Sequence, residues 1–149
     1  MFCRARSGKV KYWLFLGAFL LLLTACDRVK SLWAEKAPTI SGTITVDPAL
    51  IDKLSPQDRL FIIARQTNGG PPLAVQRIVA PQFPLRYWLT QEDVMMPGMA
   101  FQGSVNIVAR IDKDGKVGPP QPGDMEGVFP GNPTQVGKAQ VDIVINKLY

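Results

Sequence analysis

Histidine is absent from this chain of 149 residues, and cysteine occurs only twice, as Cys3 and Cys26. Without histidine, the chain lacks the usual general base of hydrolases, the usual proximal haem ligand and the commonest zinc ligand. It also contains no C-x-x-C redox pair, no C-x-x-C-H haem-attachment site and no Ser-x-x-Lys motif to activate a serine. We therefore expect no catalytic residues, no metal site and no dissociable cofactor.

The sequence has one long hydrophobic run, from Tyr12 to Leu23, and it is short for a membrane span. As a helix, residues 12–25 would be about 20 Å long, against the roughly 30 Å of a hydrocarbon core. The basic residues Arg4, Arg6, Lys9 and Lys11 precede the run, and small residues follow it. This order predicts an export signal over residues 1–25, formed as a helix, rather than a permanent transmembrane anchor.

The four residues Leu23-Thr24-Ala25-Cys26 resemble the lipobox of bacterial lipoproteins. The resemblance implies a covalent diacylglyceryl group on the Cys26 sulfur, removal of residues 1–25 and an acyl chain on the new amine. Only a thiolate could form that thioether. The alternative is that Cys26 merely follows a signal peptide or a short membrane anchor. If the lipid is present, residues 26–38 form a lipidated tether, and the membrane is a partner through that lipid.

Asp27 directly follows the cysteine and resembles the sorting signal that keeps enterobacterial lipoproteins in the inner membrane. We therefore expect the protein in the cell envelope, on the periplasmic side, at the inner rather than the outer membrane. The predicted export signal also accounts for most of the positive net charge of the chain. The seventeen basic and twelve acidic residues give +5, but four basic residues lie in residues 1–25 and leave +1 after cleavage. No nucleic-acid partner is expected.

Short segments with strand periodicity alternate with proline- and glycine-rich turns beyond the tether. From Thr39 to Val46, apolar residues alternate with serine and threonine, which predicts a half-buried strand. Asp47 and Pro48 then supply a helix cap and a first-turn proline for a short helix over residues 48–54. The apolar run at 60–65 predicts a strand central to a sheet. Further strands are expected at 73–79, 84–90, 105–111 and 141–146.

These segments predict the fold class. Six or seven short strands with little helix favour an all-β domain, an antiparallel β-sandwich of about seven strands with one short helix, over residues 39–149. Asp112-Lys113-Asp114-Gly115-Lys116 is expected to form a hairpin turn between strands. The length remaining after residue 25 suits one domain.

Two groups of residues are candidate sites. Met95, Met96 and Met99 form the most unusual segment, because clustered thioethers can ligate Cu(I) but can also pack against aromatic rings or contact a partner. They are the candidate partner- or ligand-binding residues. Asp124 and Glu126 would share a face in a strand, as the two residues of a catalytic carboxylate pair do. Because glycines flank them, they are interpreted as a solvated turn.

Several short motifs resemble, in order and spacing, the C-terminal periplasmic domain of the tetratricopeptide-containing c-type cytochrome biogenesis protein. The resemblance covers about residues 40–148 and implies an immunoglobulin-like fold in the periplasm. The motifs are Asp47-Pro48-Ala49-Leu50, Leu60-Phe61-Ile62-Ile63-Ala64-Arg65, Pro72-Leu73-Ala74-Val75-Gln76-Arg77, Met95-Met96-Pro97-Gly98-Met99, Val108-Ala109-Arg110-Ile111 and Pro120-Gln121-Pro122-Gly123-Asp124-Met125-Glu126-Gly127.

The protein of that family holds unfolded apocytochrome c for the haem-attachment machinery. Apocytochrome c or haem-ligation components are therefore the implied partners. Here the lipid is expected to replace the family's transmembrane anchor, and residues 1–39 contain no segment that resembles a tetratricopeptide repeat. The sequence thus favours a membrane-anchored, non-catalytic interaction module accessory to c-type cytochrome biogenesis. The alternatives are a methionine-based copper(I)- or ligand-binding lipoprotein and a structural envelope lipoprotein.

Overall fold

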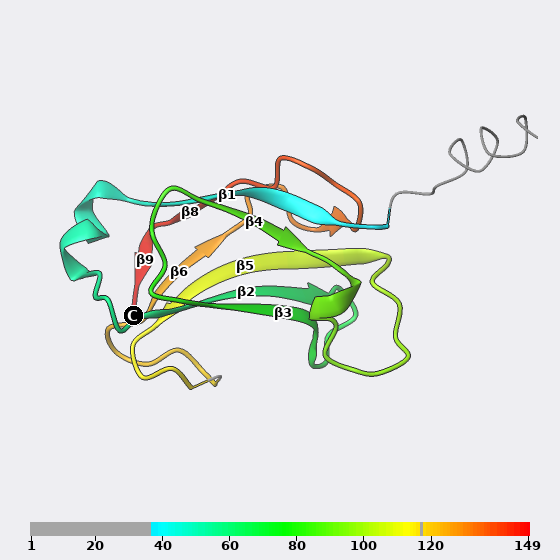
Figure 1. Cartoon of the computed structure of the whole chain (residues 1–149), viewed down its shortest axis with the longest axis horizontal. Helices are drawn as coiled ribbons and strands as arrows, with labels where there is room; N and C mark the ends of the chain where they lie inside the picture. The colour runs from blue at the N-terminus through cyan, green and yellow to red at the C-terminus, as the bar shows by residue number, and fades with distance from the viewer. Residues whose placement is uncertain (1–36, 117) are drawn as a thin grey trace, which may run out of the picture. The chain divides into compact units, whose positions relative to one another are not determined.

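The first strand of the domain, β1 (Ile40–Val46), lies at the centre of a three-stranded sheet (Figure 1). The structure, a computed structural model, describes residues 37–116 and 118–149. Strand β4 (Leu85–Leu89) pairs antiparallel to β1, and β8 (Ile143–Ile145) pairs parallel to it. The described strands pair antiparallel, as predicted, except in this β1–β8 pair. A parallel pair needs a long crossover, and most of the domain lies between these two strands.

A short helix follows β1, as the sequence predicts, and it has the 3-10 form. Helix η1 (Pro48–Lys53) begins after Asp47, whose Oδ1 accepts a hydrogen bond from the Ala49 backbone N–H at 2.9 Å. Leu50 is its one buried residue and packs into the core. The helix therefore closes one end of the sandwich, next to the end of β1.

The second sheet is larger, with the strand order β3-β2-β5-β6-β9, and β7 also pairs with β5. Strand β2 (Arg59–Gln66) lies between β3 and β5, and all residues from Leu60 to Ala64 are buried. This confirms the predicted central strand. The remaining elements are β3 (Pro72–Val79), η2 (Gln91–Asp93), β5 (Ser104–Asp112), β6 (Met125–Val128), β7 (Thr134–Gln135) and β9 (Lys147–Leu148).

The core fills the space between the two sheets. Its largest members include Ile40, Leu60, Tyr87, Phe101 and Ile107, which come from both sheets and from the segment before β5. The alternating residues Val141, Ile143 and Ile145 are also buried, as their spacing predicts. This buried cluster lies entirely within residues 40–145, and residues 37–149 form one compact unit. The predicted β-sandwich is confirmed.

The two flanks of the sandwich differ. On one flank the chain passes directly from β8 in the small sheet to β9 in the large sheet, and the Asn146 N–H donates to the Glu126 carbonyl at 3.2 Å. Gly127 makes this closure possible, because a Cβ there would lie 2.3 Å from the Val144 carbonyl oxygen. On the other flank, β3 and β4 are the outermost strands of their sheets and are joined by residues 80–84 (Figure 1).

The predicted export signal, the lipid-attachment residue Cys26, the sorting residue Asp27 and nearly all of the tether lie outside the described residues. Within residues 37–116 and 118–149, no helix has the length and apolar character to cross a membrane.

Candidate protein-interaction surface

The outer edge of β3 carries backbone groups that face away from the sheet. Residues of an antiparallel edge strand alternate in pointing their N–H and C=O groups toward the neighbouring strand and away from it. The Leu73 carbonyl points away from β2, because it accepts from the Met95 N–H at 2.9 Å, whereas the Ala80 N–H donates inward to the Asp58 carbonyl at 3.2 Å. The alternation therefore directs the backbone groups of Arg77 and the N–H of Val79 outward.

The edge of β4 is more fully occupied. The Gln76 side-chain amide reaches across from β3 and donates to the Trp88 carbonyl at 3.3 Å. At the end of β4, the Thr90 N–H donates to Asp93 Oδ2 at 2.8 Å. The start of the β3 edge is also covered, because Val94 bridges to Ala74 and η2 lies against β3. The C-terminal half of β3 is thus the freer edge on this flank.

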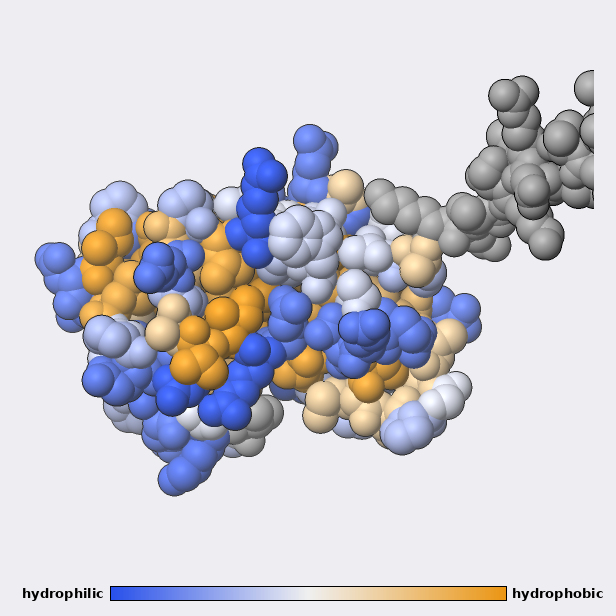
Figure 2. Space-filling model, in the orientation of Figure 1, coloured by the Kyte–Doolittle hydropathy of each residue, from blue (hydrophilic) through white to orange (hydrophobic). Residues whose placement is uncertain are grey.

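An apolar groove begins where β3 ends. It has a volume of about 430 Å³, and Val46, Ile51 and Leu54 line one side while Phe83 and Pro84 line the other. A second hollow of about 290 Å³ continues it between residues 54–56 and 80–82. Figure 2 shows hydrophobic residues gathered at this end of the molecule, around η1 and the loop from β3 to β4.

The exposed residues along this edge combine apolar and positive character. Val79 is 59% exposed, more than any other large apolar side chain in residues 37–116 and 118–149, and Ile51 in the groove is 52% exposed. Arg77 is exposed and forms no salt bridge within the described part of the chain. The surface made by Arg77, Val79 and the groove, which we call the β3-edge surface, therefore offers hydrogen-bonding groups, an apolar hollow and a positive charge together.

The predicted methionine site divides into two environments. Met95 and Met96 are 57% and 45% exposed, whereas Met99 packs against the hydrophobic core. The Met99 N–H donates to the Met96 carbonyl at 3.2 Å, which folds the segment into a turn. Two of the three thioethers are thus exposed at the surface, and the third is part of the packing of the domain. The described residues also contain no group of three or more His, Cys, Asp or Glu side chains that could hold a metal ion.

The interpretation of Asp124 and Glu126 as a solvated turn is wrong. Asp124 is only 1% exposed, and its two carboxylate oxygens accept from the backbone N–H groups of Lys113 at 3.0 Å and Gln121 at 2.7 Å. Glu126 lies in β6 and forms a salt bridge with Arg110 at 3.0 Å. The flanking glycines suggested a loop, but these carboxylates instead hold the β5–β6 connection to the sheet.

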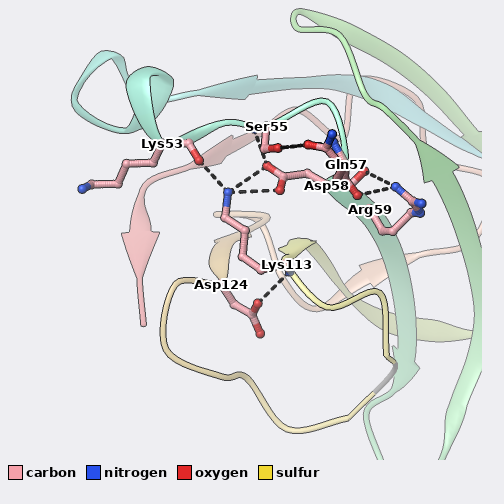
Figure 3. A network of polar contacts seen from close by, with 7 residues as sticks. All are labelled: Lys53, Ser55, Gln57, Asp58, Arg59, Lys113 and Asp124. Carbon is pink, nitrogen blue, oxygen red and sulfur yellow. Dashed lines mark hydrogen bonds and ion pairs between the residues drawn. The ribbon is translucent and has the colours of Figure 1, made fainter.

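Sequence reasoning did not identify Asp58 as an important residue. It is 2% exposed and lies in a polar network with Lys113, Ser55 and the Lys53 carbonyl (Figure 3). The available signal was the run Ser55-Pro56-Gln57-Asp58, because an aspartate three residues after a serine can accept its backbone N–H. That bond is present, from the Ser55 N–H to Asp58 Oδ2 at 2.9 Å. The network is structural, since it joins η1, β2 and the β5–β6 connection.

The titratable groups with shifted pKa values also have structural partners. Burial raises the pKa of the Tyr87 phenol, and the nearby charge of Asp142 raises it further. The phenol therefore stays protonated and donates to the Val141 carbonyl at 2.8 Å. Burial likewise raises the pKa of Asp112, whose Oδ1 accepts from the Gly115 N–H at 2.6 Å. The hairpin turn predicted at residues 112–116 is only the start of a longer connection, residues 113–124, between β5 and β6. Neither Tyr87 nor Asp112 lines the β3-edge surface.

Comparison with known proteins identifies the domain. Residues 40–146, from the start of β1 to the residue after β8, match the family described as the cytochrome c-type biogenesis protein H Ig-like domain. The chain belongs to this family. A relative of uncharacterized function from Aquifex aeolicus (strain VF5) is 29% identical over 148 residues, covering 92% of this chain and 95% of the relative. The Ig-like domain of this family therefore makes up most of the chain.

One solved structure is also similar. An alternative pilotin from the type II secretion system of Vibrio cholerae aligns with a TM-score of 0.49 and 14% sequence identity, covering 76% of this chain and 99% of the pilotin.

Proposed function

We propose that this protein is a lipid-anchored, periplasmic interaction module that assists c-type cytochrome biogenesis without catalysing a reaction. The observation that carries the proposal is the family match over residues 40–146, because it spans both sheets of the sandwich. The family's name places its Ig-like domain in a cytochrome c biogenesis protein. The partners that this role requires are apocytochrome c or components that attach haem to it.

The anchoring part of the proposal rests on the sequence alone. Leu23-Thr24-Ala25-Cys26 supplies a lipobox-like cleavage site, and Cys26 would carry the lipid. Two or more acyl chains, at about 0.8 kcal/mol per buried methylene, would hold the domain stably at a membrane. The described part of the chain supports a binding role through the β3-edge surface, which leaves backbone groups and an apolar groove exposed.

Deletion of the gene in its own host tests the function. The level of c-type cytochromes that carry covalent haem, measured by haem staining of membranes, should fall while apocytochrome is still synthesised. Expression of the wild-type chain should restore it. An undiminished level of haem-bearing cytochromes in the deletion strain would contradict a role in cytochrome biogenesis.

The lipid anchor has a separate test. The Cys26→Ala variant should lose incorporation of radioactive palmitate and should either leave the membrane or keep its signal uncut. The matched control is Cys3→Ala, which removes the other cysteine and should leave labelling and cleavage unchanged. Continued labelling of Cys26→Ala would show that the lipid is not on this residue.

A further inference from the structure

The β3 edge has the chemistry to pair with another polypeptide backbone. Its outward groups are the N–H and C=O of Arg77 and the N–H of Val79, and an added strand is their natural partner. The edge already accepts antiparallel pairing at its start, where Val94 bridges to Ala74. That contact and η2 cover the start of the β3 edge. The C-terminal half of β3 is therefore available to a segment from outside the domain.

The side chains on this edge favour one kind of occupant. An added strand would place side chains next to Arg77 and Val79 on the outer face of the sheet. Arg77 has no salt-bridge partner within residues 37–116 and 118–149, so an acidic side chain beside it would complete a pair. A second copy of the chain pairing symmetrically about Arg77 would instead bring two arginines together, which is unfavourable.

The groove supplies an apolar contact at the end of the same edge. Ala80 directly follows Val79 and lines the hollow that continues into the groove beside Phe83 and Ile51. A strand antiparallel to β3 would begin beside Val79, so its first residues lie toward the groove. An apolar side chain at that end would be buried against Ile51 and Phe83.

We propose that the β3-edge surface binds an extended segment of a partner protein as an added antiparallel strand. The segment has an apolar residue at its N-terminal end, in the groove, and an acidic residue four positions later, beside Arg77. This proposal rests on the proposed function, since it identifies the surface and the partner chemistry of that interaction module. Backbone hydrogen bonds would give affinity, and the groove and Arg77 would give selectivity.

The experiment is an NMR titration of residues 37–149, which contain the whole core, with the capped peptide Phe-Thr-Val-Thr-Glu-Thr. The backbone amide signals of residues 76–80, 82 and 83 should shift, and the amides of Arg77 and Val79 should become protected from hydrogen exchange. The Arg77→Glu variant should bind this peptide about fivefold more weakly. A peptide with lysine in place of glutamate should bind Arg77→Glu better than it binds the wild-type domain.

The matched control is Arg86→Glu, which reverses an exposed arginine on β4, the other outer strand of the same flank. It should leave peptide binding unchanged. The proposal is overturned if the peptide causes no shifts at millimolar concentration, if the shifts lie elsewhere, or if Arg77→Glu and Arg86→Glu have equal effects. Concentration-dependent pairing of β3 without peptide would identify a second copy as the occupant. None of these results depends on the cytochrome level in the deletion strain.

Discussion

The Lys113 ammonium donates to both carboxylate oxygens of Asp58, at 2.9 and 3.1 Å, across 55 residues of sequence (Figure 3). Asp58 is 2% exposed, while the lysine side chain is 29% exposed. The bond joins the turn before β2 to the connection after β5. It therefore fixes the end of the sandwich that carries η1 and the groove.

Replacement of Lys113 by methionine should lower the free energy of unfolding by about 2 kcal/mol. Loss of one partner from a fully buried ion pair costs roughly 3–5 kcal/mol, and the partial exposure of Lys113 reduces that cost. Urea unfolding of the wild-type and variant proteins measures this change in the free energy of unfolding. The matched control is Lys116→Met, since Lys116 pairs with Asp114 at 3.6 Å and its side chain is 84% exposed. That variant should change stability by less than about 0.5 kcal/mol; an equal loss in both variants would contradict a special role for Asp58.

Asp112, the last residue of β5, and Asp114, in the β5–β6 connection, should give opposite pH dependences of stability. Burial, followed by a hydrogen bond shared with Asp114, raises the pKa of Asp112. A carboxyl with a raised folded-state pKa holds its proton more tightly in the folded protein. The pKa of this carboxyl in the unfolded chain is about 4. As the pH rises from that value through the higher folded-state pKa, the free energy of unfolding therefore falls. The Lys116 backbone N–H lowers the pKa of Asp114, whose stabilisation is lost as the pH falls below about 4.

The Asp112→Asn variant should thus show a smaller decline in unfolding free energy as the pH rises above about 4. Its amide oxygen can still accept from the Gly115 N–H. The Asp114→Asn variant should alter the profile only below about 4. Urea unfolding at a series of pH values checks both. If Asp112→Asn leaves the profile above that pH unchanged, ionisation of Asp112 is not the source of the decline.

Local patterns in the sequence predicted the core-forming strands because each strand carries its own signal. The apolar run at Leu60–Ala64 predicted a central strand, and the alternation of Val141, Ile143 and Ile145 predicted three buried residues. Asp47 and Pro48 predicted the position of η1. In each case the preference of a few neighbouring residues agrees with their packing in the sandwich.

Features that depend on contacts between residues far apart in the sequence could not be predicted in the same way. The parallel pairing of β1 with β8 joins residues 99 positions apart, such as Ile44 and Ile143. Strand β6 contains Gly127, which weakens its strand pattern, yet the glycine is required by the approach of Val144. The β3-edge surface likewise depends on which strand lies outermost, and strand order leaves little trace in a single sequence.

Substitution of Met99 should destabilise the domain, whereas substitution of Met96 should not. Met99 packs against the core, so Met99→Ala should lower the free energy of unfolding by about 2 kcal/mol. Met96 is 45% exposed, and Met96→Ala should change it by less than about 0.5 kcal/mol. Thermal and urea unfolding compare the two. Equal destabilisation would show that Met96 also supports the fold and would weaken its assignment as a partner-binding residue.

A single methyl group added at Gly127, on the flank where the chain passes from β8 to β9, should strongly lower the stability of the domain. A Cβ there would lie 2.3 Å from the Val144 carbonyl oxygen and 2.9 Å from Ile143 Cγ2, so β6 and β8 would have to separate. Gly127→Ala should therefore lower the free energy of unfolding by about 2–3 kcal/mol. The matched control is Gly118→Ala, where a Cβ meets no atom within 4 Å and stability should change little. Because the two substitutions add the same methyl group, an equal small effect would mean that β6 moves away from β8 at little cost, and the flank would then be loosely closed.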